Sequence, residues 1–324
     1  MSYRLSVADP GLRTWSGHHA ASLEALGLAC GTERVEFFCH HCPDQVLQAE
    51  SLRLGVRLTP WFDRSFYEAF DSTGTLVELN GFINSLARDY LRLFTHLART
   101  DPGGLVLHHT MDWPHLVALG IATARLNGTS PSLRHLVLLM FHPGVDESTG
   151  ILEPRRFLNY RVALARLVKQ PNVRLFASCR EHAAAYGALA PEHGPLPVHP
   201  SFLCSRLPVT EQQQAHVPAR SLRRSLKGAH VVLYVGDAKA EKGFGRLPDV
   251  IRALVPSLDE HSELIIQYNL NEALVSNDLL SVAATLRAMA AADRRIKVLP
   301  RFLSDRDLKA LVSSSSLVIF NYDP

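Results

Sequence analysis

The 324-residue sequence has little excess charge of either sign. Lys and Arg together number 34 and Asp and Glu 31, so the formal net charge at pH 7 is only +3. Proteins whose main partner is a nucleic acid usually present a strongly basic surface. We therefore expect no nucleic-acid partner, whereas acidic small molecules remain plausible ligands.

The sequence also lacks segments that would place it in or across a membrane. No stretch approaches the roughly 20 apolar residues of a transmembrane helix. The start, MSYRLSVADP, has neither the charged nor the apolar region of a secretion signal. Five cysteines, an odd number, suit free thiols in a reducing compartment better than a disulfide framework. We predict a cytoplasmic protein.

The sequence does not contain a complete zinc-binding pattern. Cys39, His40, His41 and Cys42 are ligand types, but four consecutive residues at a strand end cannot all point at one ion. No second C-x-x-C or H-x-x-x-H motif supplies further ligands. We therefore expect no bound metal ion and no cofactor.

What the sequence does have is an alternation of strand and helix patterns. In the first part, strands are predicted at residues 4–8, 35–39, 105–109, 136–141 and 173–177, and helices at 20–29, 82–98, 111–126, 155–168 and 180–189. Such an alternation is typical of a parallel sheet that is covered on both faces. It predicts a doubly wound domain.

The alternation stops in a proline-rich stretch and then resumes. Residues 191–224 contain six prolines, which discourage regular structure. Beyond it, strands are predicted at residues 230–235, 263–268, 296–299 and 317–320, and helices at 245–255, 277–292 and 305–313. We predict an α/β chain with two Rossmann-like doubly wound domains, at residues 1–200 and 229–324, joined by a linker at 201–228.

Residues 231–243, VVLYVGDAKAEKG, form a candidate phosphate-binding turn. Gly236 would let the chain turn sharply after a buried strand, and Lys242 and Gly243 would open the next helix. The amide groups and dipole of a helix N-terminus favour anions, and Lys242 adds a cation, with Lys239 as a helper. The alternative is an ordinary turn with a solvated lysine.

Histidines gather at or just after the ends of predicted strands. They are His18, His19, His108, His109 and His142. Open parallel sheets bind ligands at this edge. Ligand contact and a structural role are equally compatible with His18 and His109, and a structural role is favoured for His19 and His108. For His142 the alternatives are a sugar contact and a histidine that caps its own loop.

Three segments carry a resemblance to a known family. They are LVLLMFHPGVD, VVLYVGDAKAEKGFGRLPDVI and RIKVLPRFLSDRDLKALVSSSSLVIFNYDP. In this order they resemble elements of the GT-B glycosyltransferases, in particular the retaining family 4. The resemblance implies metal-independent transfer of a sugar, with retention, from a nucleotide-sugar donor to a glycan or lipid-linked acceptor, as in polysaccharide biosynthesis. The donor would lie mostly on the second domain and the acceptor on the first.

The resemblance also assigns roles to residues. Donor-binding residues would be Gly17, Gly236, Asp237, Lys242 and Gly243, although Asp237 stands where the family often has arginine. A carboxylate beside a diphosphate is repulsive unless it turns to a hydroxyl, so Lys242 would carry most of the phosphate contact. His142 would be the catalytic residue of the first domain, and His18 and His109 candidates for the acceptor side.

Two features leave alternatives open. The chain ends before the paired glutamates that the family places after the last strand, so we expect an incomplete second domain and weak or absent activity. A non-catalytic nucleotide-sugar-binding protein is therefore an alternative, as is an epimerase of the same fold, which would need paired carboxylates. The basic run Arg220, Arg223, Arg224 and Lys227 is either a solvated face or a peripheral contact with the inner face of a membrane, where lipid-linked acceptors reside.

Overall fold

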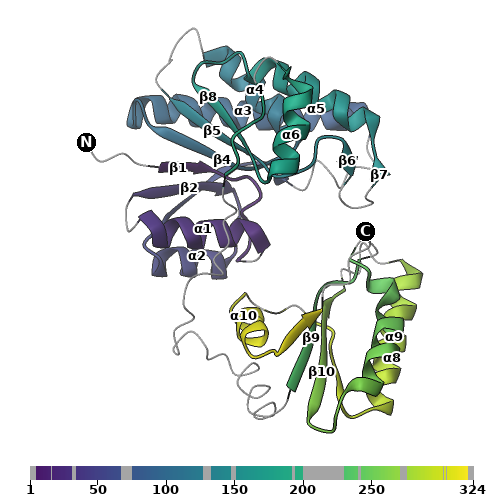
Figure 1. Ribbon diagram of the computed structural model, residues 1–324. Helices are drawn as coiled ribbons and strands as arrows, with labels where there is room; N and C mark the ends of the chain where they lie inside the picture. Colours follow the sequence, from purple (N-terminus) through teal and green to yellow (C-terminus); the bar gives the residue numbers. More distant parts are fainter. Residues whose placement is uncertain are drawn as a thin grey trace. The chain divides into compact units, whose positions relative to one another are not determined.

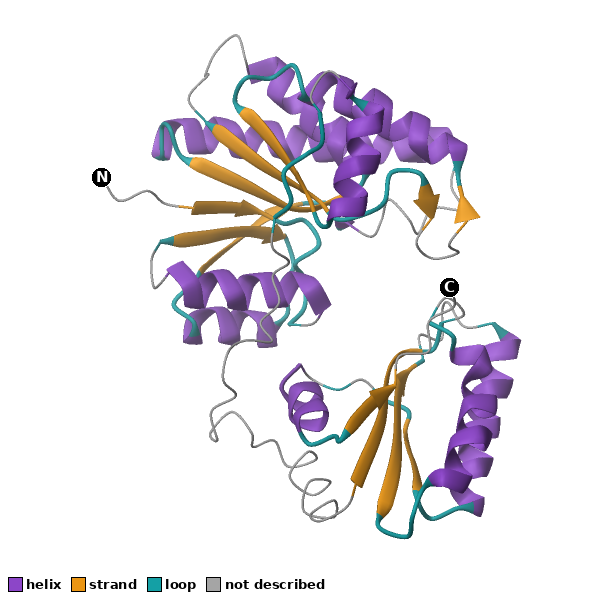
Figure 2. Cartoon of the chain, in the orientation of Figure 1, coloured by secondary structure: helices purple, strands orange, loops and turns teal. Residues whose placement is uncertain are grey.

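The computed structural model describes residues 5–15, 17–30, 34–66, 75–126, 133–146, 151–191, 194–199, 230–239, 242–270, 276–301, 303 and 305–319. The chain divides into two compact units, residues 1–147 with 151–206 and residues 148–150 with 207–324. The predicted linker and its basic run lie outside the described residues. Each unit contains its own parallel sheet, with helices on both faces (Figure 2).

The first unit contains a six-stranded parallel sheet in the order β3-β2-β1-β4-β5-β8. Its strands are β1 (Leu5–Ala8), β2 (Val35–His40), β3 (Arg57–Phe62), β4 (Leu105–Met111), β5 (Arg134–Leu139) and β8 (Val173–Ala177). The strand order reverses between β1 and β4, which pair directly, Ala8 beside His108. Open α/β sheets bind ligands at such a switch point, outside the carboxyl ends of the strands.

Helices cover both faces of this sheet (Figure 1). On one face lie α1 (Gly17–Cys30) and α2 (Gln45–Arg53), and on the other α3 (Leu76–Thr100), α4 (Trp113–Leu126), α5 (Pro154–Leu167) and α6 (Arg180–Leu189). Successive strand residues point to opposite faces. Val7 accordingly packs in one core with Leu23 of α1, and Ala8 packs in the other with Leu86 of α3.

Several elements of the first unit differ from the sequence prediction. Helix α2, strand β3 and the short hairpin of β6 (Val145–Asp146) and β7 (Ile151–Leu152) were not predicted. Strand β3 contains Pro60 and is only partly buried, as befits an edge strand, so its pattern is weak. Helix α1 begins at Gly17 rather than at residue 20, so residues 17–19 form its first turn.

The second unit has a four-stranded parallel sheet in the order β11-β10-β9-β12. Its strands are β9 (His230–Asp237), β10 (Ser262–Asn269), β11 (Ile296–Leu299) and β12 (Leu317–Ile319), and its helices are α8 (Leu247–Leu254), α9 (Asn277–Ala292) and α10 (Asp305–Ser313). Short 3-10 turns, Phe244–Arg246 and Val255–Ser257, flank α8. Helices α8 and α9 pack on one face, and α10 packs on the other. Here the strand order reverses between β9 and β12.

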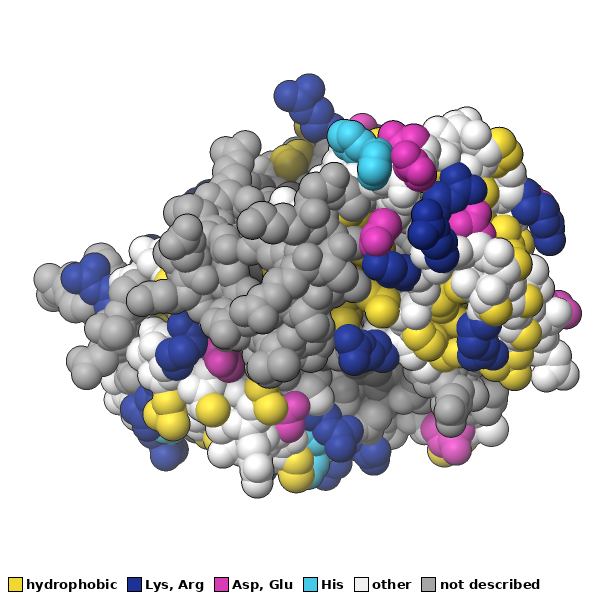
Figure 3. All heavy atoms as spheres, turned by 90° about the horizontal axis from the view of Figure 1, so that it is seen from below, with side chains coloured by type: hydrophobic (Ala, Val, Ile, Leu, Met, Phe, Trp, Pro, Cys, Tyr) yellow, Lys and Arg dark blue, Asp and Glu magenta, His cyan; other side chains and the backbone are white. Residues whose placement is uncertain are grey.

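The surface agrees with the small net charge. On the face shown in Figure 3, described Lys and Arg side chains lie beside Asp and Glu side chains at several places. Within the described ranges, no helix has the length and apolar character that a membrane span requires.

Candidate functional sites

The turn after β9 lies at the switch point of the second sheet, but its glycines differ from the prediction. Gly236 and Asp237 still belong to β9, where they pair with Tyr268 and Asn269 of β10, so the turn does not begin at Gly236. Gly243 has a left-handed backbone, with φ 65°, directly before a 3-10 turn. Glycine adopts that conformation without strain, so the conformational requirement falls on Gly243. Helix α8 begins only at Leu247, and Lys242 therefore precedes it by more than one turn.

Lys242 and Asp237 form an ion pair across this turn. The Lys242 Nζ lies 3.0 Å from the Asp237 Oδ2, and the Asn269 amide donates a hydrogen bond to the Asp237 Oδ1 at 3.2 Å. Burial raises the pKa of Asp237, but the hydrogen bonds from Lys242 and Asn269 outweigh it, and the pKa is lowered overall. The carboxylate is thus charged at neutral pH and holds the ammonium group beside the turn. A phosphate would have to share the Lys242 ammonium group with Asp237 or take the place of the Asp237 carboxylate beside it.

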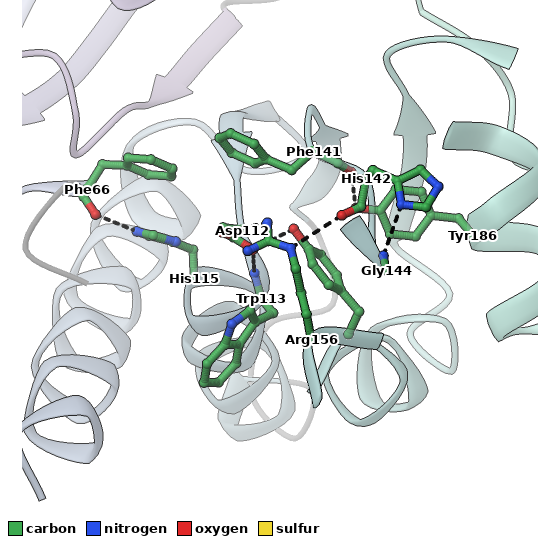
Figure 4. Close-up of polar contacts among 10 residues, drawn as sticks. Phe66, Asp112, Trp113, His115, Phe141, His142, Gly144, Arg156 and Tyr186 are labelled. Carbon is green, nitrogen blue, oxygen red and sulfur yellow. Dashed lines mark hydrogen bonds and ion pairs between the residues drawn. The ribbon is translucent and has the colours of Figure 1, made fainter. Parts of the chain in front are cut away.

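In the first unit, His142 follows β5 and is held by its own loop and by α5. The backbone N–H of Gly144 donates to the His142 Nδ1 at 3.1 Å, and the Arg156 Nε donates to the His142 carbonyl at 3.3 Å (Figure 4). Because Nδ1 accepts this hydrogen bond, the neutral ring carries its proton on Nε2. His142 is half-buried and therefore suited to donate a hydrogen bond to a ligand hydroxyl.

Beside His142 lies a buried ion pair that the sequence did not predict. Asp112, directly before α4, accepts hydrogen bonds from the Trp113 amide at 2.6 Å and from the Arg156 Nη2 at 3.0 Å (Figure 4). It also accepts one from the Tyr160 hydroxyl. The side chains of Asp112 and Arg156 are 1% and 13% exposed. Burial lowers the pKa of Arg156, but Asp112 outweighs it and raises the pKa overall. The pair joins α4 to α5 and fixes the guanidinium group that holds His142.

A second polar group lies at the switch point between β1 and β4. Asp9 follows β1, and its Oδ1 is 2.7 Å from the His19 Nδ1 in the first turn of α1. The His18 ring lies 4.1 Å from the His19 ring and 5.8 Å from the His109 ring, centroid to centroid. Asp9, His19 and His109 are buried, whereas His18 is exposed. We call these four residues the histidine cluster.

The path of β4 separates His109 from His108. The pairing of β4 with β5 shifts register between His108 and Met111, and Thr110 has a left-handed φ of 57°, which is rare for a residue with a branched side chain. His108 faces the α3 side of the sheet and shares a hydrogen bond of 3.1 Å with His135. The predicted residues His18 and His109 thus come together, and they are joined by His19, for which we expected a structural role.

The remaining predicted positions are structural or exposed. Gly17 begins α1 with a left-handed φ of 67°, and nothing described lies within 4 Å of where its Cβ would stand. The Cys39 thiol donates to the carbonyls of His40 and Thr59, and burial raises its pKa to about 12. The His40 ring accepts a hydrogen bond from the Cys42 amide. Residues 39–42 are therefore not arranged around a common point.

The comparisons with known proteins establish the fold. A scan against models of protein families found no match, and a search of curated proteins found none. Among solved structures, the chain is similar to the trehalose-6-phosphate synthase OtsA, with a TM-score of 0.63 and 12% identity over 98% of this chain and 78% of that chain.

Two further structures show the same likeness. One is an α,α-trehalose-phosphate synthase (UDP-forming) from Burkholderia xenovorans in complex with glucose-6-phosphate, with a TM-score of 0.63 and 10% identity over 97% of this chain and 78% of that chain. The other is Anabaena HepE in complex with UDP and glucose, with a TM-score of 0.54 and 12% identity over 98% and 73%. Together with the two parallel sheets, this likeness shows that the chain has the α/β GT-B fold, built from Rossmann-like units.

Proposed function

We propose that the protein is a glycosyltransferase that moves a sugar, with retention and without a metal ion at the diphosphate, from a nucleotide-sugar donor to an acceptor hydroxyl. The observation that carries the proposal is the cationic turn, Lys242 with the left-handed Gly243, at the switch point of the second sheet. Support comes from the fold, since similar structures were solved with UDP and glucose and with UDP-2-fluoro glucose.

The donor would bind to the second unit. Negative charge accumulates on the diphosphate as the glycosidic bond breaks, and a preorganised cation stabilises that charge. The Lys242 ammonium group, 3.0 Å from Asp237, would turn to the phosphate, and Asp237 would then accept a hydrogen bond from a donor hydroxyl. Gly236 and Gly243 would allow close approach of the backbone to the donor. Because the similar structures named above were solved with UDP or a UDP sugar, we propose uracil as the base of the donor nucleotide.

The acceptor would bind to the first unit beside His142. Its Nε2–H would donate to a sugar hydroxyl, and its position is fixed by Gly144 and Arg156. A glycan or lipid-linked acceptor remains our proposal, with the protein in the cytoplasm or at the inner face of the membrane. A sugar phosphate is a second acceptor class, because one similar structure was solved with glucose-6-phosphate.

The test is calorimetry of the full chain with UDP, GDP and ADP. Lys242→Ala should raise the Kd of the preferred nucleotide about 10- to 150-fold, which corresponds to about 1.5–3 kcal/mol for a charge-assisted contact. The matched control is Lys297→Ala, since Lys297 also lies in the second unit and is ion-paired, 2.7 Å from Glu263. The control should leave the Kd unchanged within about twofold.

The outcomes separate the proposals. Equal nucleotide affinity in Lys242→Ala and the parent chain would overturn the phosphate-binding role. Nucleotide binding without transfer from any nucleotide sugar would favour the non-catalytic alternative. Where transfer occurs, the anomeric configuration of the product, read by NMR spectroscopy, decides between retention and inversion.

A further inference from the structure

The histidine cluster contains a buried carboxylate, that of Asp9, which has no lysine or arginine partner among the described residues. Asp9 is 0% exposed, and its Oδ1 accepts a hydrogen bond from the Gly11 amide at 3.1 Å as well as contacting His19. Within the described part of the chain, the Asp9 Oδ2 has no hydrogen-bond partner. A buried charge is costly unless it is paired. A positive charge close to Asp9 would therefore stabilise the folded chain.

The three imidazole rings lie close together, with centroids 4.1 to 5.8 Å apart. One ring nitrogen of each of His18, His19 and His109 lies within 4.8 Å of the others. In a tetrahedral zinc site with Zn–N bonds of about 2.0–2.1 Å, ligand nitrogens lie about 3.3 Å apart. Closing the widest separation requires a movement of about 1.5 Å. The exposed side chain of His18 can supply it by rotation.

Asp9 also contacts one of the three rings and so orients it. The contact of the His19 Nδ1 with Asp9 leaves Nε2 as the ligand atom of that ring, and a carboxylate behind a histidine is a common arrangement at metal sites.

We propose that His18, His19 and His109 bind one divalent transition-metal ion, zinc by ligand type, with Asp9 orienting His19. Three nitrogen ligands leave a fourth position, and the exposure of His18 opens that side to an oxygen ligand from water or substrate. The site goes beyond the proposed donor chemistry, because none of its residues belongs to the Lys242 turn. It departs from our sequence expectation of no metal, since His109 is distant in sequence from His18 and His19 and no local spacing links them.

The test is zinc binding by the full chain after removal of metal with a chelator and dialysis. We expect one Zn²⁺ per chain with a Kd at or below about 1 μM, and no binding of Mg²⁺ at that concentration. His18→Ala should raise the Kd for zinc at least about tenfold, since it removes one of three ligands. Because His18 is exposed, the substitution should not disturb folding. Asp9→Asn should raise it about 10- to 100-fold.

The controls are His261→Ala, an exposed histidine of the second unit, and Lys242→Ala, and both should retain the parent Kd. Co²⁺ provides a second measurement, because a tetrahedral site gives strong visible absorption that His18→Ala should abolish. No stoichiometric zinc binding, or an equal Kd in His18→Ala and the parent, would overturn the proposal. It would leave the contact of His19 with Asp9 as a structural one. Neither result bears on the nucleotide affinity that tests the proposed function.

Discussion

Replacing Asp112 with asparagine would test whether the buried ion pair with Arg156 stabilises the first unit. The substitution keeps the size of the side chain and one oxygen that can accept from the Trp113 amide and the Tyr160 hydroxyl. It removes the charge, however, and turns an amide group toward the Arg156 guanidinium group, whose Nη2 now lies 3.0 Å from the Asp112 Oδ2.

The expected magnitude follows from the burial of both partners. Asp112 is 1% and Arg156 13% exposed at the side chain, so water can replace the lost contact only in part. Breaking a buried pair by changing one partner costs about 3–5 kcal/mol, because the other charge stays buried without compensation. Tyr160→Phe, which removes only one hydrogen bond to the carboxylate, should cost about 1.5–3 kcal/mol.

Tryptophan fluorescence during urea denaturation would measure this effect in one unit. All three tryptophans, Trp15, Trp61 and Trp113, lie in the first unit, so the signal reports on its unfolding. The matched control is Glu50→Gln on α2. It breaks an ion pair with Arg53, whose side chain is 53% exposed, and should lower the free energy of unfolding by less than about 0.5 kcal/mol. A loss in Asp112→Asn no larger than in this control would refute the reasoning.

Three other outcomes can be checked with the same chain. Gly81→Ala should stabilise the first unit by about 0.5–1 kcal/mol, because Gly81 is an exposed residue inside α3. Gly17→Ala should destabilise the same unit by about 1 kcal/mol, because alanine adopts the φ of 67° at this position only with strain. Urea denaturation would contradict both if Gly17→Ala were the more stable variant. Burial lowers the pKa of His135 to about 4 in the folded chain. Between about pH 6.5 and pH 4 the unfolded chain therefore binds more protons than the folded chain, so the free energy of unfolding should fall as the pH falls through this range. A urea midpoint that stays constant from pH 6.5 to 4 would contradict this. His142→Ala should lower the turnover of any sugar transfer but leave nucleotide affinity unchanged, and full activity in the variant from pH 6 to 9 would make His142 structural.

Local patterns were sufficient to predict most of the elements. The bounds predicted for β8, α6, α9, β11 and α10 agree with the structure, because their apolar periodicity and end signals lie within each segment. The alternation of strands and helices likewise predicted parallel sheets and the α/β fold. No helix or strand was predicted between residues 40 and 81, where edge strand β3 and helix α2 bury few side chains and so show little periodicity.

The sites depended on tertiary structure. Asp112 meets Arg156 and Tyr160 only because α4 and α5 pack together, 44 and 48 residues apart in sequence. His108 and His109 are neighbours in sequence, yet one faces His135 and the other the histidine cluster, because side chains alternate along a strand and β4 is irregular at Thr110. Sequence determined which residue types stand near the strand ends. Which of these residues meet was decided by tertiary structure: by the pairing of β1 with β4, by the irregularity of β4 near Thr110 and by the start of α1 at Gly17. The contacts join segments that no local pattern in the sequence connects.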